Sequence, residues 1–508
     1  MKKRILTFVL ALAAALSARA NAAEERLRLD DAIALALQKS EALMIERESV
    51  AAATASVRAA EGAYDQVLEL EGAWQRSKNP AAIFPGVSTP LNVPDDRSSG
   101  LSLGVRQLLP TGGALSLRAL GQRETSEGTF TPLSPSYGTQ VGVELRQPLL
   151  RDRAIDPARL SVRVANADRE GADASLRRAV IETVAAVERA YWSLVAARMA
   201  VGVREEAVRL AEEQIDETQT RVAHGSAPPT EMAQPRAELD RRRGELLSGE
   251  EAVSRAENAL KLLILADGDA AWSAHIAPAE TVKVDVAHVD LAASLDRALA
   301  TRPELELAQS GLRRRQAESS FASDGVLPGL AAVVSYDRYG LAGSGAGLPS
   351  QFRGQFGQSF QTLGDGDLNS ARFALVLDLP VRNITARSSA AAARNVENQA
   401  AAEIGRVRKA IRAEVLDAAA ALETAVKRID AARSGREAAE IQLAAEKDRF
   451  DNGLSINFLV LTRQNDLSRA RLDEISALTD YRMARIEMSR ASGTLADERG
   501  LDPSGRAQ

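Results

Sequence analysis

The sequence predicts an internally duplicated, mainly α-helical fold with a membrane β-barrel section, and three observations lead to this prediction. Two very long helical segments each end at a glycine, Gly225 and Gly453, which lie 228 residues apart. Apolar residues recur every seven positions before both glycines, in the same register. Ahead of each long helix, the apolar pattern changes to the period of two that is typical of strands. A fixed register in both halves indicates two copies of one unit.

The seven-residue stripe predicts how the long helices pack. Eleven of its twelve positions are apolar, and the exception is Arg436. A strict repeat of seven predicts a coiled-coil seam with a left-handed twist. The stripe consists of Val187, Leu194, Val201, Val208, Ile215 and Val222 in the first copy, and of Val415, Leu422, Ile429, Arg436, Leu443 and Phe450 in the second.

The N-terminal 22 residues have the pattern of a secretory signal peptide. Lys2, Lys3 and Arg4 precede an apolar run over residues 5–16, and Ala20-Asn21-Ala22 supplies a cleavage site. The alternative is an uncleaved anchor, but the run is far shorter than the ~20 residues that a spanning helix needs.

Composition excludes several kinds of site. The chain has no cysteine, which excludes disulfides, thiolate metal sites, a thiol nucleophile and a lipid-modified N-terminal cysteine. The formal net charge is −5 with acids and bases interspersed, so we expect no nucleic-acid binding. The three histidines, His224, His275 and His288, lie in unrelated contexts, and there is no nucleophile motif or phosphate loop. We therefore expect no enzyme, and no catalytic, cofactor-binding or metal-binding residues.

Each copy is predicted to begin with a shorter helix. The first starts at Leu29, with Asp30 and Asp31 in its first turn, and can continue to about Ala60. Its counterpart covers residues 291–321 at an offset of 262. Pro303 falls inside this second helix and should kink or restart it.

Six segments alternate between apolar and polar residues and are predicted strands. One apolar face and one partly charged face is the pattern of a membrane β-barrel, although a half-buried soluble sheet has the same period. A tight turn at residues 110–113 contrasts with long connections at 77–98, 124–138 and 340–370, as in outer-membrane barrels. The Gly364–Asp367 run could hold a cation or form a polar turn. The six segments are residues 66–76, 101–106, 115–120, 141–146, 332–337 and 373–379.

Two very long helices follow the strands. The first covers residues 157–222, about 66 residues or ~100 Å, and the second covers residues 383–450. Gly225 and Gly453 should end them, and return helices should start at once. A short strand is expected at residues 282–286.

The predicted organisation has five parts. Residues 1–22 are the signal peptide, 23–265 the first repeat with its tip at 221–230, and 266–290 an equatorial connector. Residues 291–495 are the second repeat with its tip at 449–458, and 496–508 a disordered tail. One chain has too few strands to close a barrel, and open sheet edges are not tolerated in lipid. Cyclic oligomerisation would pool the strands into one barrel and the helices into a hollow tube.

With these features, the chain resembles the TolC-like outer-membrane efflux protein family over nearly its whole length after the signal peptide. The resemblance is carried by the order, spacing and duplication of motifs that are individually weak. It implies a homotrimer with a trimer-shared β-barrel in the outer membrane and a long coiled-coil α-helical barrel in the periplasm. The matching motifs are residues 29–43, Gln147-Pro148-Leu149-Leu150, the tips Arg221/Gly225 and Arg449/Gly453, and the second return helix with Leu467, Ala470, Leu472, Tyr481, Ala484 and Ser492-Gly493-Thr494-Leu495.

The resemblance also implies a function. The channel would be the passive exit duct of a tripartite efflux or type I secretion system, driven by an inner-membrane transporter of the RND, ABC or MFS type. A periplasmic adaptor, or membrane fusion protein, would dock at the tips, at Arg221, Gly225, Ser226, Arg449, Gly453 and Leu454. The glycines also have the simpler role of helix caps. The alternative function is a periplasmic coiled-coil scaffold without a channel, which would leave the strands unexplained.

Two departures from the family pattern matter. Family members usually give four barrel strands per protomer, whereas this chain has six candidates. Either the barrel is wider, or two candidates lie outside the membrane. Relatives also place aspartates just after the second tip glycine, where this chain has Leu459 and Thr462. We expect a periplasmic entrance constricted by Phe458, Leu459 and Thr462 without strong cation binding, unless these side chains only pack between helices.

Overall fold

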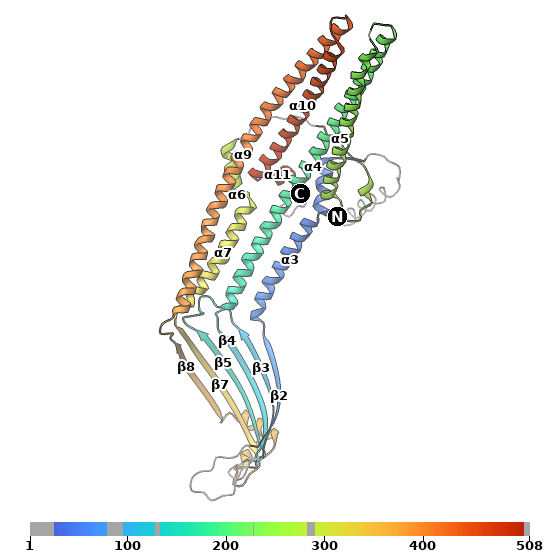
Figure 1. Ribbon diagram of the computed structural model, residues 1–508. Helices are drawn as coiled ribbons and strands as arrows, with labels where there is room; N and C mark the ends of the chain where they lie inside the picture. Colours follow the sequence, from blue (N-terminus) through green and yellow to red (C-terminus); the bar gives the residue numbers. More distant parts are fainter. Residues whose placement is uncertain (1–24, 79–94, 128–132, 227, 282–289, 502–508) are drawn as a thin grey trace. The chain divides into compact units, whose positions relative to one another are not determined.

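The computed structural model describes residues 25–78, 95–127, 133–226, 228–281 and 290–501 (Figure 1). The chain divides into two compact units, each assembled from separate stretches of sequence. A helical unit contains the residues up to Val50, Gly171–Ala308 and the residues from Glu403 onward. A strand unit contains Ala51–Glu170 and Gln309–Ala402. The signal peptide and the predicted strand at 282–286 lie outside the described residues.

Each half of the chain begins with a pair of helices. In the first half, α2 (Leu29–Lys39) is followed by α3 (Glu41–Glu61). In the second half, α6 (Leu291–Thr301) is followed by α7 (Pro303–Asp324). Every start, and the end of the shorter helix, keeps the offset of 262 residues, which supports the internal duplication.

Both helix pairs are broken at the same repeat position. Ser40 and Arg302 each have extended backbone between the two helices. The expected restart at Pro303 is confirmed, because its ring prevents the helix from continuing. The prediction of one unbroken helix from Leu29 to about Ala60 is wrong. The break at Ser40 has no proline to mark it in the sequence.

All six predicted strands belong to one antiparallel sheet, in the order β2-β3-β4-β5-β7-β8. Most strands are longer than their alternating patterns indicated, because parts of the predicted loops also pair. The tight turn between β3 and β4 is confirmed by the Gly112 N–H, which donates to the Leu109 carbonyl at 2.9 Å. The strands are β2 (Val67–Lys78), β3 (Asp95–Leu108), β4 (Ala114–Thr125), β5 (Ser136–Pro148), β7 (Gly329–Gly343) and β8 (Asn369–Asp378).

The connection between β7 and β8 contains structure that the sequence did not predict. Instead of a long irregular loop, it holds a 3-10 turn, η4 (Ser350–Phe352), and a helix, α8 (Phe356–Asp365). Gly366 ends α8 with a φ of 80°, so the Gly364–Asp367 run is a helix end. No cluster of three candidate metal ligands occurs among the described residues.

The long helices are close to their predicted bounds. They are α4 (Pro157–Ala223) and α9 (Ile384–Asp451). The first return begins with a 3-10 turn, η2 (Pro229–Met232), before α5 (Ala233–Ile264), and the second is α10 (Asn457–Ser492). Across the part of the chain that the structure describes, no helix is both long enough and apolar enough to span a bilayer.

The helical unit has two apolar cores. In one, α4 residues such as Val184, Val187 and Leu194 pack with α2 and α5. In the other, α9 packs with α10 and α6 around the buried Tyr481. The buried α9 residues are spaced by four and three alternately, which is the pattern of a coiled-coil seam. They are Ile411, Val415, Ala418, Leu422, Ala425 and Ile429.

The chain ends of the helical unit also fold together. The connector contributes η3 (Ala270–Ser273) and β6 (Ile276–Pro278), which pairs in parallel with β1 (Glu25–Leu27). The prediction of a disordered tail from residue 496 is wrong for residues 496–501. They continue α11 (Leu495–Glu498) and end at the buried Leu501. The tail appeared polar because its apolar contacts are limited to two leucines.

Candidate channel wall, tips and entrance

The six-stranded sheet has one apolar face. The strand registers place the alternating apolar residues of all six strands on the same side. These side chains stay exposed to an unusual degree, with Trp74 at 72% and Phe373 at 70%. A contiguous exposed apolar face of this size indicates contact with lipid or protein. Its large residues are Leu68, Leu70, Trp74, Leu101, Leu103, Val105, Leu117, Val141, Val143, Leu145, Val334, Tyr336, Phe373, Leu375 and Leu377.

The opposite face of the sheet is charged. It carries acids and bases in similar numbers on neighbouring strands, so it suits contact with water. Alternation between a lipid-compatible and a water-compatible face is what a channel wall requires. The charged side chains are Glu69, Glu71, Arg106, Arg118, Glu144, Arg146, Asp337 and Arg372.

Both edges of this sheet are open. Within the described residues, β2 pairs only with β3 and β8 pairs only with β7. Backbone N–H and C=O groups along an open edge have no partner in a lipid environment. The sheet is therefore incomplete as a membrane wall in a single chain.

The two tips end their long helices with the same motif. Gly225 and Gly453 have φ values of 71° and 69°. The Ser226 N–H donates to the Arg221 carbonyl at 2.9 Å, and the Leu454 N–H donates to the Arg449 carbonyl at 2.8 Å. These bonds, with those from each glycine to the residue three positions earlier, make two Schellman caps. The predicted glycine stops are confirmed.

The tips are exposed and differ in character. Gly225 and Ser226 are exposed at the first tip, and the Ser226 hydroxyl also donates to the Arg221 carbonyl at 3.0 Å. At the second tip, Leu454 is 80% exposed. The two tips meet where the Arg221 guanidinium lies over the Phe450 ring, 4.5 Å from its centre. Arg449 is itself exposed.

The predicted entrance residues begin α10. Phe458 is 53% exposed and Leu459 38%, whereas Asn457, Val460 and Leu461 of the same turn are buried. The Thr462 hydroxyl donates to the Phe458 carbonyl at 2.8 Å. Phe458 and Leu459 thus lie away from the packed side of α10 within this chain.

A buried polar cluster near the tips was not predicted. Arg242 of α5 is only 2% exposed and donates to Glu238 at 2.7 Å and to the Ala207 carbonyl at 2.7 Å. Its second terminal nitrogen donates to Gln464 of α10 at 3.3 Å. Asn457 donates to Thr218 of α4 at 3.3 Å. The available signal was the spacing of Ala207, Ala211, Gln214 and Thr218, which places polar residues in a helix seam.

One carboxyl group at the tips has a perturbed acidity. Partial burial raises the pKa of Glu217 in α4, and the negative charge of Asp451 in α9 raises it further. Lys447 and Arg221 oppose this shift. Asp466, the other acid near the entrance, pairs with Arg463 at 3.1 Å.

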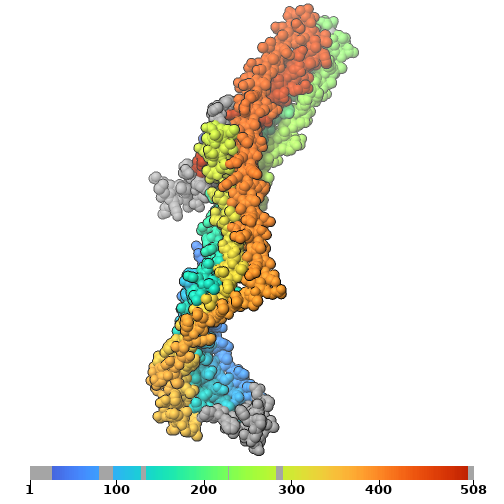
Figure 2. Space-filling view, turned by 90° about the vertical axis from the view of Figure 1, so that its left-hand side faces the viewer, coloured from blue at the N-terminus to red at the C-terminus, as the bar shows by residue number. Residues whose placement is uncertain are grey.

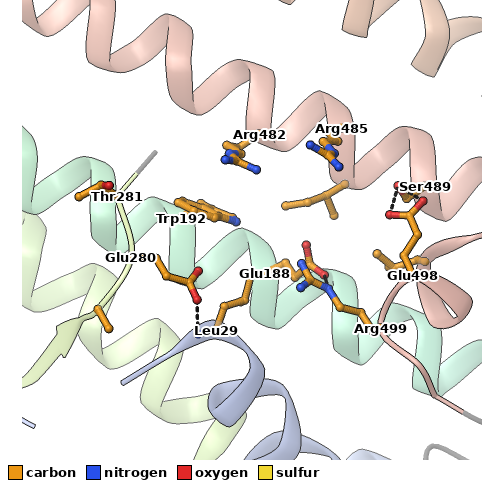
Figure 3. A pocket seen from close by; sticks show the side chains of 13 residues that line it. Leu29, Glu188, Trp192, Glu280, Thr281, Arg482, Arg485, Ser489, Glu498 and Arg499 are labelled. Atoms are coloured by element: carbon orange, nitrogen blue, oxygen red, sulfur yellow. Dashed lines mark hydrogen bonds and ion pairs between the residues drawn. The ribbon is translucent and has the colours of Figure 1, made fainter. Parts of the chain in front are cut away.

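A cavity of about 680 Å³ lies between α4, α10 and the chain ends of the helical unit (Figure 3). The Arg482 guanidinium lies 4.5 Å from the centre of the Trp192 ring. Arg499 donates to Glu188 at 2.8 Å, and the Leu29 N–H donates to Glu280 at 3.4 Å. These interactions fasten both chain ends to α4.

Comparison with known proteins identifies the pattern. Residues 113–264 and 294–494 match the family model described as outer membrane efflux protein. The fold is similar to the Campylobacter jejuni CmeC outer membrane channel, with 15% identity, 92% of this chain and 85% of that chain covered, and a TM-score of 0.65. It is also similar to the outer membrane protein VceC of Vibrio cholerae, with 15% identity, 92% and 96% covered, and a TM-score of 0.65. The open state of the Neisseria gonorrhoeae MtrE outer membrane channel gives 16%, 92%, 89% and 0.62. No curated protein matched.

Proposed function

The chain belongs to the outer membrane efflux protein family and is an outer-membrane channel rather than an enzyme, and from this we propose that it works as a homotrimeric, passive exit duct. The open-edged sheet carries this proposal. Three copies would join β8 of one protomer to β2 of the next and so close a barrel in the outer membrane. The long helices would form the periplasmic tube, and an inner-membrane transporter would supply the energy.

The uncovered sides of the long helices support the trimer. Figure 2 shows that one side of α9 (orange) is uncovered beside α10 (red). Ile441 and Leu416 of α9 are exposed there. Apolar side chains at these positions are expected to pack against neighbouring helices rather than stay in water. A scaffold without a channel would leave the apolar face of the sheet without a role.

We propose a barrel of eighteen strands, six from each protomer. The alternative, in which two strands lie outside the membrane, is disfavoured because the apolar face continues across all six strands. A trimer with the usual four strands per protomer has twelve. Since barrel diameter grows roughly in proportion to strand number, this barrel is about half as wide again.

Single cysteines in this cysteine-free chain test the edge pairing. Ala73→Cys in β2 is combined in turn with Ser370→Cys, Arg372→Cys, Ala374→Cys or Val376→Cys in β8, all on the charged face. We expect at least one combination to form disulfide-linked trimers in membranes, and the purified trimers to conduct ions in planar bilayers. The control replaces the β8 position by Ser116→Cys in β4, which lies inside the sheet and should not crosslink chains. Absence of crosslinked trimers from all four combinations would refute the pairing.

We propose that a periplasmic adaptor docks at the tips, on Gly225, Ser226, Gly453 and Leu454 with their flanking arginines. Leu454 supports this, because a leucine that is 80% exposed is a candidate contact for an apolar partner. An RND-, ABC- or MFS-type transporter would complete the assembly. Crosslinking from Ser226→Cys and Leu454→Cys in cells should capture the adaptor, whose identity separates tripartite efflux from type I secretion.

Charging the second tip should uncouple the duct from its pump. Leu454→Glu places a charge in an apolar contact, so transport should be lost while trimers remain in the membrane. Leu454→Met keeps the apolar side chain and should retain transport. Transport by Leu454→Glu at the level of the unaltered protein would remove Leu454 from the docking site.

A further inference from the structure

Helix α8 lies on the apolar face of the sheet. Thr139 alternates with Val141 and Val143 and therefore shares their face. Its hydroxyl donates to the Ser359 carbonyl of α8 at 2.9 Å. The Leu341 N–H of β7 donates to the Thr362 hydroxyl at 2.9 Å. These contacts hold α8 against the side of the sheet that would face away from the channel interior.

The sheet has a row of small residues under α8. Gly121, Thr139 and Gly340 are register partners on β4, β5 and β7. A Cβ atom at Gly340 would overlap the Ser359 carbonyl oxygen, and one at Gly121 would lie 2.6 Å from the Phe356 ring. A side chain larger than these would lift the helix off the strands. The row is therefore a fitted seat for α8.

The seat lies at one limit of the apolar band. From Leu330 to Gly340, β7 has ten residue steps, which rise about 26 Å along the membrane normal at a tilt of ~40°. The apolar band of an outer-membrane barrel is about 25 Å tall. Gly340 lies toward the β7–β8 connection, at the end of the sheet where the long loops are. Helix α8 therefore crosses the wall where acyl chains give way to head groups.

The side chains around α8 suit that boundary. Phe356, Phe360 and Leu363 follow one side of the helix at helical spacing, and Phe360 is 53% exposed. Trp74 and Tyr137 belong to the next row of the same face, one step beyond the seat. Only 4% of the sequence is aromatic, so this clustering is informative. Aromatic side chains gather at both interfaces of membrane barrels.

A buried charge gives α8 a second role. Arg338 lies on the apolar face, two residues from Gly340 toward the centre of the band. Its guanidinium donates to the Gly364 carbonyl at the end of α8, at 3.3 Å. The carbonyl end of a helix favours a cation. Without this helix, the Arg338 charge would face acyl chains.

We propose that α8 is a membrane-interface helix. It inserts Phe360 among outer-leaflet lipids at the boundary between head groups and acyl chains, and so sets the depth of the barrel. Lipid is the occupant because the helix continues the apolar face of the channel wall. The inference rests on the proposed function in one respect, namely that this face is the lipid-facing side of the barrel.

Spin labels on single cysteines test the depth of α8 in the full-length protein in liposomes of bacterial phospholipid. Phe360→Cys is compared with Gln361→Cys on the polar side of α8 and with Tyr336→Cys in the middle of the band. At position 360, we expect relaxation by oxygen to exceed relaxation by a water-soluble nickel chelate several-fold. At position 361, the order should reverse. The depth at 360 should be shallower than at 336.

The outcomes separate the helix from the barrel. If 336 lies in lipid but 360 responds to nickel as 361 does, α8 stands above the membrane and the inference fails. It also fails if 360 is shielded from both reagents, because protein then covers it. If 336 itself lies in water, the proposed channel wall fails first. Adding Gly340→Val should free α8, making the label at 360 mobile and nickel-accessible while the label at 336 is unchanged.

Discussion

The two tip glycines show what a single residue contributes here. Gly225 and Gly453 adopt the left-handed conformation, yet no neighbouring atom lies close enough to exclude a Cβ. Glycine is required there by its backbone and not by space. The same helix contains Gly202, which also has open surroundings but lies within α4.

We therefore predict opposite effects for the same substitution at two positions. Gly225→Ala should destabilise the tip by about 1 kcal/mol, because alanine is strained at positive φ. Gly202→Ala should stabilise α4 by about 0.5–1 kcal/mol through helix propensity. Native-state hydrogen exchange of amides at the end of α4 measures both. Equal effects of the two substitutions would contradict the requirement for a left-handed residue.

Local signals were the most predictable at this scale. The glycine stops follow from composition and register within one helix, and both were correct. Arg242 was missed because its burial depends on Gln464, which lies 222 residues away in the sequence. A polar residue in a helix seam acquires its meaning only when the partner helix is known.

At the scale of elements, α4 and α9 meet at the tips through opposing interactions. The Arg221 guanidinium lies against Phe450, which favours contact, whereas Glu217 faces the charge of Asp451, which opposes it. The raised pKa of Glu217 means that the folded protein holds its proton more tightly than the unfolded chain does. Stability is therefore highest at low pH and falls as pH rises through the ordinary and then the raised pKa of Glu217.

Neutralising this group should remove the cost. Glu217→Gln should raise the melting temperature at pH 8 more than at pH 4, because only the ionised carboxylate is unfavourable. Thermal unfolding of the purified trimer at both pH values measures the difference. Glu213→Gln on the same helix is the control, since Glu213 pairs with Arg209 at 2.5 Å and should give no gain. An equal shift at both pH values would exclude the pKa as the cause.

Periodicity predicted the principal elements, but not the ones that tertiary contacts define. The long helices and six strands carry their patterns along the chain. Helix α8 has only ten residues and depends on a seat of small residues in three other strands. The break at Ser40 became interpretable only beside its repeat counterpart, Arg302.

At the scale of the whole molecule, the width of the barrel and the width of the entrance have different consequences. A wall with six strands per protomer does not limit flow if eighteen strands enclose it. The narrowest point would then be the periplasmic entrance, where we propose that Phe458, Leu459 and Thr462 line the path. Resistance to ions in a channel is dominated by its narrowest section.

Enlarging this entrance should therefore raise conductance. Phe458→Ala and Leu459→Ala, alone and together, should each increase the single-channel conductance of the trimer in planar bilayers. Gln122→Ala on the charged face of β4 is the matched control and should leave conductance unchanged. Conductance that stays constant in all entrance variants would mean that these side chains pack between protomers and do not constrict the path.

The chemistry of the entrance gives a second readout in the same recordings. Apolar side chains and a hydroxyl offer no carboxylate cluster, so micromolar trivalent cations should not block the unaltered channel. Asp451→Asn with Asp466→Asn removes the nearest acids and should not change this insensitivity. Thr462→Asp would place three carboxylates at one level of the trimer and should create the block. If cations block the channel after both acids are removed, another site must line the path, and the apolar entrance would be wrong.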